Sequence, residues 1–235
     1  MSSPDKKAIR KVVTASLIGA TIEWYDFFLY GVIAGLVFNK LYFPSHDPVV
    51  GTLLAYATFA VGFIARPFGG VIFGHFGDKI GRKSMLIFTL MIMGLATFLI
   101  AFIPTYDSIG IWAPILLLLC RIVQGLGLGG EWGGAVLMTY EYAPKNKRGF
   151  YASLPQIGLS IGLCLASGIV ALLSGTLTNE AFLDWGWRVA FMLSALLVFV
   201  GLYIRLTVQE TPEFSKVKEA NAESKVPFYD MMKRY

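Results

Sequence analysis

Six long apolar segments limit what this chain can fold into. They cover roughly residues 12–38, 49–74, 84–103, 110–138, 151–175 and 187–208. About 20 apolar residues are enough for a helix to cross the hydrocarbon core of a bilayer. Only 15% of the residues are charged, against about 25% in an average soluble domain. The sequence therefore predicts an all-α polytopic membrane protein with six transmembrane helices in the lipid bilayer.

The basic residues alternate between the loops. Fifteen of the 20 Lys and Arg residues lie in the N-terminal tail, after the second segment, after the fourth segment and after the sixth. The other loops hold Lys40, with Arg188 at the start of the sixth segment. Because Lys and Arg are enriched in cytoplasmic loops, we expect both termini in the cytoplasm and the chain in a cell membrane, either plasma or bacterial inner. This placement explains the net charge of +5 without a nucleic-acid partner.

The chain divides into three predicted parts. Residues 1–11 form a cytoplasmic N-terminal tail, residues 12–208 the six-helix transmembrane bundle, and residues 209–235 a cytoplasmic linker or tail. The last part has ten charged residues among 27 and contains no seventh apolar segment.

Two acidic residues lie inside the first apolar segment. Glu23 and Asp26 are three positions apart and Tyr30 follows four later, so all three can share one helix face. Each buried acid costs about 2.5–3.5 kcal/mol on insertion scales and normally faces a bundle interior or a wet cavity. The pattern predicts part of a proton or substrate path, with a buried structural network as the alternative.

The fourth segment carries an arginine near its middle. Arg121 and Gln124 fall on one helix face, whereas Glu131 is rotated from Arg121 by about 80° at roughly 100° per residue. An arginine at this depth needs an anionic partner, either protein or substrate. The alternative is a glycine packing seam with one structural ion pair.

A short charged and glycine-rich stretch separates the second and third segments. It runs from Gly74 to Lys83 and includes Asp78, Gly81 and Arg82. Polar backbone needs water or protein partners, so we expect a tight hairpin at a membrane surface. Glu141, at the end of the fourth segment, is expected on the same side.

These motifs together resemble the N-terminal half of a major facilitator superfamily transporter, and more narrowly the metabolite:proton symporter family. The residues that carry the resemblance are Glu23-Trp24-Tyr25-Asp26-Phe27, the Gly74–Lys83 stretch, Arg121-x-x-Gln124-Gly125, Gly129-Gly130-Glu131-Trp132-Gly133-Gly134 and Glu210-Thr211-Pro212-Glu213-Phe214.

The resemblance implies a six-helix bundle of two inverted three-helix repeats. It implies a cytoplasmic gate in which Asp78 and Arg82 meet Glu141 and a partner half. The first and fourth helices would line the cavity, with Glu23, Asp26, Arg121 and Gln124 handling proton and substrate. Glu131 would be a cavity acid or part of the gate.

Proton-coupled uptake of a small organic acid or zwitterionic metabolite by alternating access is the predicted function, with the proton as coupling ion and no other cofactor. The alternatives are a non-transporting half that acts as assembly partner or sensor, and efflux of another substrate class. An enzyme is disfavoured because the sequence has no H-E-x-x-H motif and only two histidines.

Such transporters usually have two six-helix halves. We expect a second half, either a missing C-terminal half or a homodimer partner, because a lone bundle would expose its polar face, including Arg121, to lipid.

Overall fold

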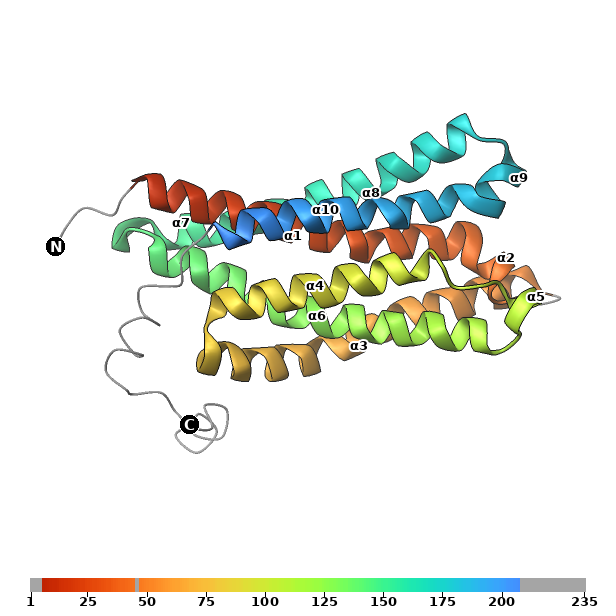
Figure 1. Cartoon of the computed structure of the whole chain (residues 1–235), viewed down its shortest axis with the longest axis horizontal. Helices are drawn as coiled ribbons and strands as arrows, with labels where there is room; N and C mark the ends of the chain where they lie inside the picture. Colours follow the sequence, from red (N-terminus) through yellow and green to blue (C-terminus); the bar gives the residue numbers. More distant parts are fainter. Residues whose placement is uncertain (1–5, 45–46, 208–235) are drawn as a thin grey trace.

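The computed structural model describes residues 6–44 and 47–207, and these form a helical bundle (Figure 1). Six helices in this part are long and apolar enough to cross a membrane. The first combines α1 (Lys6–Ile33), the π-helical η1 (Ala34–Phe38) and α2 (Asn39–Leu41). The others contain α3 (Pro48–Ile80), α4 (Arg82–Ile100), α6 (Trp112–Tyr142), α8 (Ile157–Thr176) and α10 (Trp187–Leu206).

Short helical segments join the long ones. They are α5 (Tyr106–Ile109), η2 (Lys145–Lys147), α7 (Arg148–Ser153), η3 (Leu154–Gln156), α9 (Asn179–Ala181) and η4 (Phe182–Gly186). The start of α1, the α3–α4 turn, α7 and the end of α10 all lie at one end of the bundle, which we call the basic end (left in Figure 1). The short α2, α5 and α9 lie at the opposite end. Within the described residues, the two loops with basic residues that were predicted to share one membrane side, after the second and fourth apolar segments, therefore lie at the same end of the bundle.

The helices pack in pairs, α3 with α6 and α1 with α8, while α4 lies between α6 and α10. In its most hydrophobic stretch, 67% of the first span is buried, against 22% for the span that contains α8. The first span is thus the centre of this bundle, and α8 keeps a broad face for lipid or another protein.

Glycine lets α3 and α6 touch along their backbones. A Cβ added at Gly69 or Gly129 would meet the carbonyl oxygen of Leu126 or Arg66. Gly158 and Gly162 of α8 allow a similar approach to α1, because a Cβ at either position would lie within 3 Å of the α1 backbone. Small residues allow such approach between membrane helices.

The tight hairpin predicted within Gly74–Lys83 is present, but most of that stretch is helix and the turn is shorter than the sequence indicated. α3 continues to Ile80 and α4 begins at Arg82, so the turn consists of Gly81 alone. Gly81 has φ 102° and ψ 145°, a conformation that glycine adopts without steric cost. Helix α1 begins at Lys6, within the predicted tail, and the membrane-span candidate that contains it runs from Ile9 to Leu41. The predicted tail at 209–235 lies outside the described residues.

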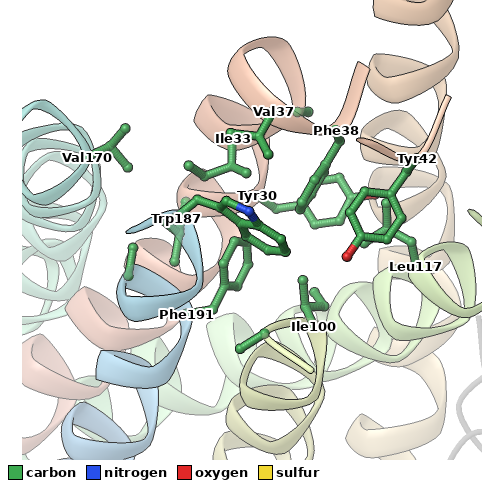
Figure 2. Close-up of a cluster of buried hydrophobic side chains, with 14 of the residues drawn as sticks. Tyr30, Ile33, Val37, Phe38, Tyr42, Ile100, Leu117, Val170, Trp187 and Phe191 are labelled. Atoms are coloured by element: carbon green, nitrogen blue, oxygen red, sulfur yellow. The ribbon is translucent and has the colours of Figure 1, made fainter. Parts of the chain in front are cut away.

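An aromatic cluster fills the bundle at the end opposite the basic end (Figure 2). Trp187 packs edge-on against Phe38, Tyr42 and Phe191. The Tyr42 hydroxyl donates to the Ile103 carbonyl over 2.7 Å. This core joins the first span to α4, α6 and α10 and places the polar side chains of α1 and α6 in the bundle interior.

Candidate functional site

Two arginines are buried in the bundle, at different depths and in different company. Arg121 comes from the middle of α6 and is fully buried, and Arg205 comes from the last turn of α10 and is 5% exposed. A buried cation is costly unless paired or hydrogen-bonded, so their surroundings indicate what each can do.

Three aromatic rings enclose the Arg121 guanidinium. Its Cζ lies 3.9 Å from the ring centroid of Phe27, 4.6 Å from that of Tyr30 and 4.5 Å from that of Phe59. The negative faces of such rings attract a desolvated cation. Gly62 provides the space on α3, because a Cβ there would lie 2.6 Å from Arg121 Nε.

A hydrogen-bonded chain leads away from Arg121. Nη1 donates to Gln124 Oε1 over 3.0 Å, and Gln124 Nε2 donates to Thr97 Oγ1 over 2.8 Å. The other terminal nitrogen, Nη2, has no hydrogen-bond partner. Among the described residues no carboxylate forms a salt bridge with Arg121. The site therefore holds a cation whose Nη2 is available to donate a hydrogen bond to an anionic group.

Asp26 and Tyr30 flank this chain. The Asp26 carboxyl is 1% exposed and lies beside the Ser194 and Thr97 hydroxyls, and its Oδ1 has no hydrogen-bond partner. Tyr30 shares a 2.6 Å hydrogen bond with Thr58. Asp26 is thus connected to Arg121 through Thr97 and Gln124.

Glu131 and Arg205 form the second buried site. Arg205 Nη2 pairs with Glu131 Oε1, and Arg205 Nη1 lies 2.8 Å from Oε2. The Thr89 hydroxyl donates to Oε2 over 3.1 Å, and Arg205 Nη1 also donates to the Leu86 carbonyl. A bidentate pair with added hydrogen bonds is the geometry that offsets burial of both charges.

Glu23 adjoins this second site. Its carboxyl is 3% exposed, and the positive charges of Arg205 and Arg66 act on it. One of its oxygens, Oε1, has no hydrogen-bond partner. Arg205 Nη2 packs on Gly19, one turn before Glu23, where a Cβ would collide with it. Arg205 therefore lies between Glu131 on α6 and the Glu23 face of α1.

The residues predicted for a cytoplasmic gate lie at the basic end. The expected contact is present, since Arg82 Nη1 pairs with Glu141 Oε1, and Arg82 Nη2 lies 4.0 Å from Asp78. Lys83 donates to the Leu206 carbonyl over 3.1 Å. Gly74 lines a cavity of about 330 Å³ between α3 and α6, with Asp78 and Arg82 at its margin.

The structure rearranges the predicted site. It brings together Tyr30, Arg121 and Gln124, but it places Glu23 and Glu131 around a different arginine. The expectation that a lone bundle exposes Arg121 was wrong, because the rings of α1 and α3 cover it. Glu23, Asp26 and Tyr30 of α1 also lie beside different groups. Glu23 lies near Arg205, Asp26 beside the Ser194 and Thr97 hydroxyls, and Tyr30 beside Thr58.

Sequence reasoning missed Arg205 and Thr97. Arg205 had a signal, since it is a cation within an apolar segment and Glu131 needed a counter-ion from another helix. Thr97 had none, because threonine is common in membrane helices and its role depends on the packing of α4 against α6. Within residues 6–44 and 47–207, no three His, Cys, Asp or Glu side chains gather as a metal site requires.

The sequence of residues 11–232 matches the family described as sugar (and other) transporter. The shikimate transporter of Escherichia coli is 49% identical over 228 residues, covering 96% of this chain and 52% of the relative. The inner membrane metabolite transport protein YhjE of the same organism is 50% identical over 225 residues, with 96% and 51% covered. The Escherichia coli proline/betaine transporter is 43% identical over 240 residues, with 98% and 48% covered. The chain thus spans about half the length of these curated relatives.

The same half appears in solved structures. The partially occluded, inward-open xylose transporter XylE from Escherichia coli superposes with a TM-score of 0.80 at 18% identity, covering 91% of this chain and 51% of XylE. The likeness shows a common fold and matches the N-terminal half of that protein. The chain therefore belongs to the sugar (and other) transporter family of the major facilitator superfamily, whose members are transporters and not enzymes.

Proposed function

We propose that this chain forms the N-terminal half of a secondary active transporter for a small organic acid or zwitterionic metabolite, driven by a proton. The proposal rests on the Nη2 donor of Arg121, which has no hydrogen-bond partner. A substrate carboxylate can accept a charge-assisted hydrogen bond from Nη2, and such bonds are roughly twice as strong as neutral ones.

The names of the relatives support this chemistry. Shikimate is an organic acid, and proline and betaine are zwitterions, so each carries a carboxylate. A proton symporter is also found among the solved structures with this fold. The buried acids Glu23 and Asp26 are the groups proposed to exchange the proton.

Access to Arg121 requires a second half and a moving cavity. Arg121 is sealed on its own bundle by Phe27, Tyr30 and Phe59, so substrate would reach it when these rings move or when the two halves rock around a shared cavity. The relatives are about twice as long as this chain, which favours a C-terminal half as the partner over a homodimer. The basic end is proposed to face the cytoplasm of a bacterial inner membrane.

The test compares Arg121→Gln with Arg10→Gln, which removes an exposed arginine from the same bundle. Each variant is reconstituted in proteoliposomes together with the proposed C-terminal half, and accumulation of shikimate, proline, betaine and xylose is measured under an imposed proton gradient. We expect Arg121→Gln to abolish carboxylate accumulation and Arg10→Gln to retain it.

Accumulation by Arg121→Gln equal to wild type would refute the role of Arg121. A folded wild-type chain that moves none of the substrates would instead favour the non-transporting half, and transport of xylose alone would refute the carboxylate preference.

A further inference from the structure

The cluster around Arg205 contains more buried acid than its cation can neutralise. Both Glu23 and Glu131 are at most 3% exposed; Glu131 pairs with Arg205, and the Arg205 guanidinium packs on Gly19, one turn before Glu23 on α1. Each terminal nitrogen of the guanidinium is engaged by Glu131, while Glu23 Oε1 has no hydrogen-bond partner. Two carboxylates that share one site do not both ionise readily, because each disfavours the charge on the other.

From this geometry we propose that Glu23, Glu131 and Arg205 form a proton-binding site in which Arg205 is the shared counter-ion and Glu23 holds the proton in this conformation. The proposal deepens the proposed function, on which it rests for the role of the proton in transport. Arg205 acts as a positioning residue, since it decides which carboxylate is ionised.

The other charged groups around Glu23 leave room for this assignment. On α1, Asp26 lies one turn away and adds negative charge. On α3, Arg66 faces Glu23 but is partly exposed, and its guanidinium lies 5.2 Å from the Trp24 ring. The described part of α8, which packs on α1, carries no charged residue.

The elements around Arg205 add one more cation. On α4, Lys83 lines a small pocket with Arg205 at the basic end and donates to the Leu206 carbonyl. Thr89 of the same helix gives Glu131 a neutral hydroxyl donor. Glu131 is therefore the carboxylate with more ion-pair and hydrogen-bond partners, and Glu23, whose Oε1 has no hydrogen-bond partner, is the one that holds the proton.

Exchange of partners would couple the proton to helix movement. When Glu23 loses its proton, its carboxylate competes with Glu131 for the same guanidinium. Because Glu23 is on α1, Glu131 on α6 and Arg205 on α10, a change of partner shifts α1 relative to the other two helices. Proton release and movement of the central helix thus become one event.

The experiment is infrared spectroscopy of the 235-residue chain in lipid vesicles, which detects the carbonyl band of a protonated carboxylic acid. The Asp26→Asn background removes the neighbouring acid from the spectrum. We expect a band that disappears as pH rises and that is absent in Glu23→Gln. Glu141→Gln, which changes an acid at the basic end, should leave the band in place.

Glu131→Gln tests the shared counter-ion. With Glu131 uncharged, Arg205 is free to pair with Glu23, so the midpoint of the band's pH titration should fall by at least about one unit, a tenfold loss of proton affinity. Thr89→Ala, which removes one hydrogen bond from Glu131, should shift the midpoint in the same direction by less and serves if Glu131→Gln does not fold.

A band that persists in Glu23→Gln would overturn the assignment of the proton, and an unchanged midpoint in the Glu131 or Thr89 variant would overturn the shared counter-ion. Neither readout uses substrate or flux. A failure here therefore leaves the Arg121 result standing, and a failure of the Arg121 test leaves this one standing.

Discussion

The cost of burying a cation is offset differently at the two buried arginines. Arg205 is neutralised by a bidentate carboxylate, Glu131, and anchors α10 to α6. Arg121 has no carboxylate salt bridge within the described residues and is held by three aromatic rings and Gln124. A cation that is already paired stabilises the bundle, whereas one held by neutral groups keeps its charge available to a ligand. Burial alone thus does not distinguish a structural charge from a functional one.

Replacing each arginine should have the largest effects on the free energy of unfolding, and the two effects should differ. Arg205→Met leaves Glu131 buried without its cation, and we expect the free energy of unfolding to fall by about 3–5 kcal/mol. Arg121→Met leaves no buried carboxylate behind, so the expected loss is about 1–2 kcal/mol from the ring contacts and the Gln124 hydrogen bond. Denaturant unfolding of the chain in detergent micelles measures both.

The double variant Glu131→Leu with Arg205→Met is the control. Replacing a whole buried pair by apolar residues is often neutral, so most of the stability lost in Arg205→Met should return. Equal losses for the two single variants would show that Arg121 has an unrecognised anionic partner.

A glycine lies against each buried arginine, and replacing it tests how tightly that arginine is packed. A Cβ at Gly19 would collide with Arg205, and one at Gly62 with Arg121. We expect Gly19→Ala and Gly62→Ala each to lower the free energy of unfolding by about 1–3 kcal/mol, with the larger loss at Gly19 because the displaced guanidinium also leaves Glu131. Gly74→Ala, where no atom lies within 4 Å, should show no loss and a gain of up to about 1 kcal/mol from helix propensity, and a loss there would mean that the cost at Gly19 and Gly62 does not come from their contacts with the arginines.

A third arginine extends the comparison to partial exposure. The Arg82 side chain is 20% exposed and pairs with Glu141. Because water and salt screen such a pair, Arg82→Gln should cost only about 0–1 kcal/mol, and less as ionic strength rises. Lys79→Gln removes a positive charge from the same turn and controls for net charge. A cost as large as that of Arg205→Met would show that Arg82 is shielded like a core residue.

Much of the architecture was predictable because apolar length is a local property of the chain. All six predicted segments became long helices, and the basic loops within the described residues, after the second and fourth segments, lie at one end. The boundaries near Gly74–Lys83 were not predictable in the same way. Charge and glycine there suggested a loop, but helical hydrogen bonds satisfy the backbone of α3 up to Ile80, so the turn needs only Gly81.

The candidate site was predicted in its residues and not in its pairing. Glu23, Asp26, Arg121 and Glu131 stood out because ionisable groups are rare in membrane helices. Their partners come from other helices, as with Thr97 for Gln124 and Arg205 for Glu131. Spacing along one helix specifies a face, but it carries no information about which neighbour packs on that face.

The six membrane-spanning segments and the side chains that are costly to bury could be predicted from the amino-acid sequence. Hydrophobic length and charge placement act locally, so they can be read one segment at a time. The ion pair between Arg205 and Glu131, and the aromatic rings that cover Arg121, became apparent only in the folded structure. Those outcomes depend on how α1, α3, α6 and α10 approach one another, and that approach is set by contacts between residues far apart in the chain.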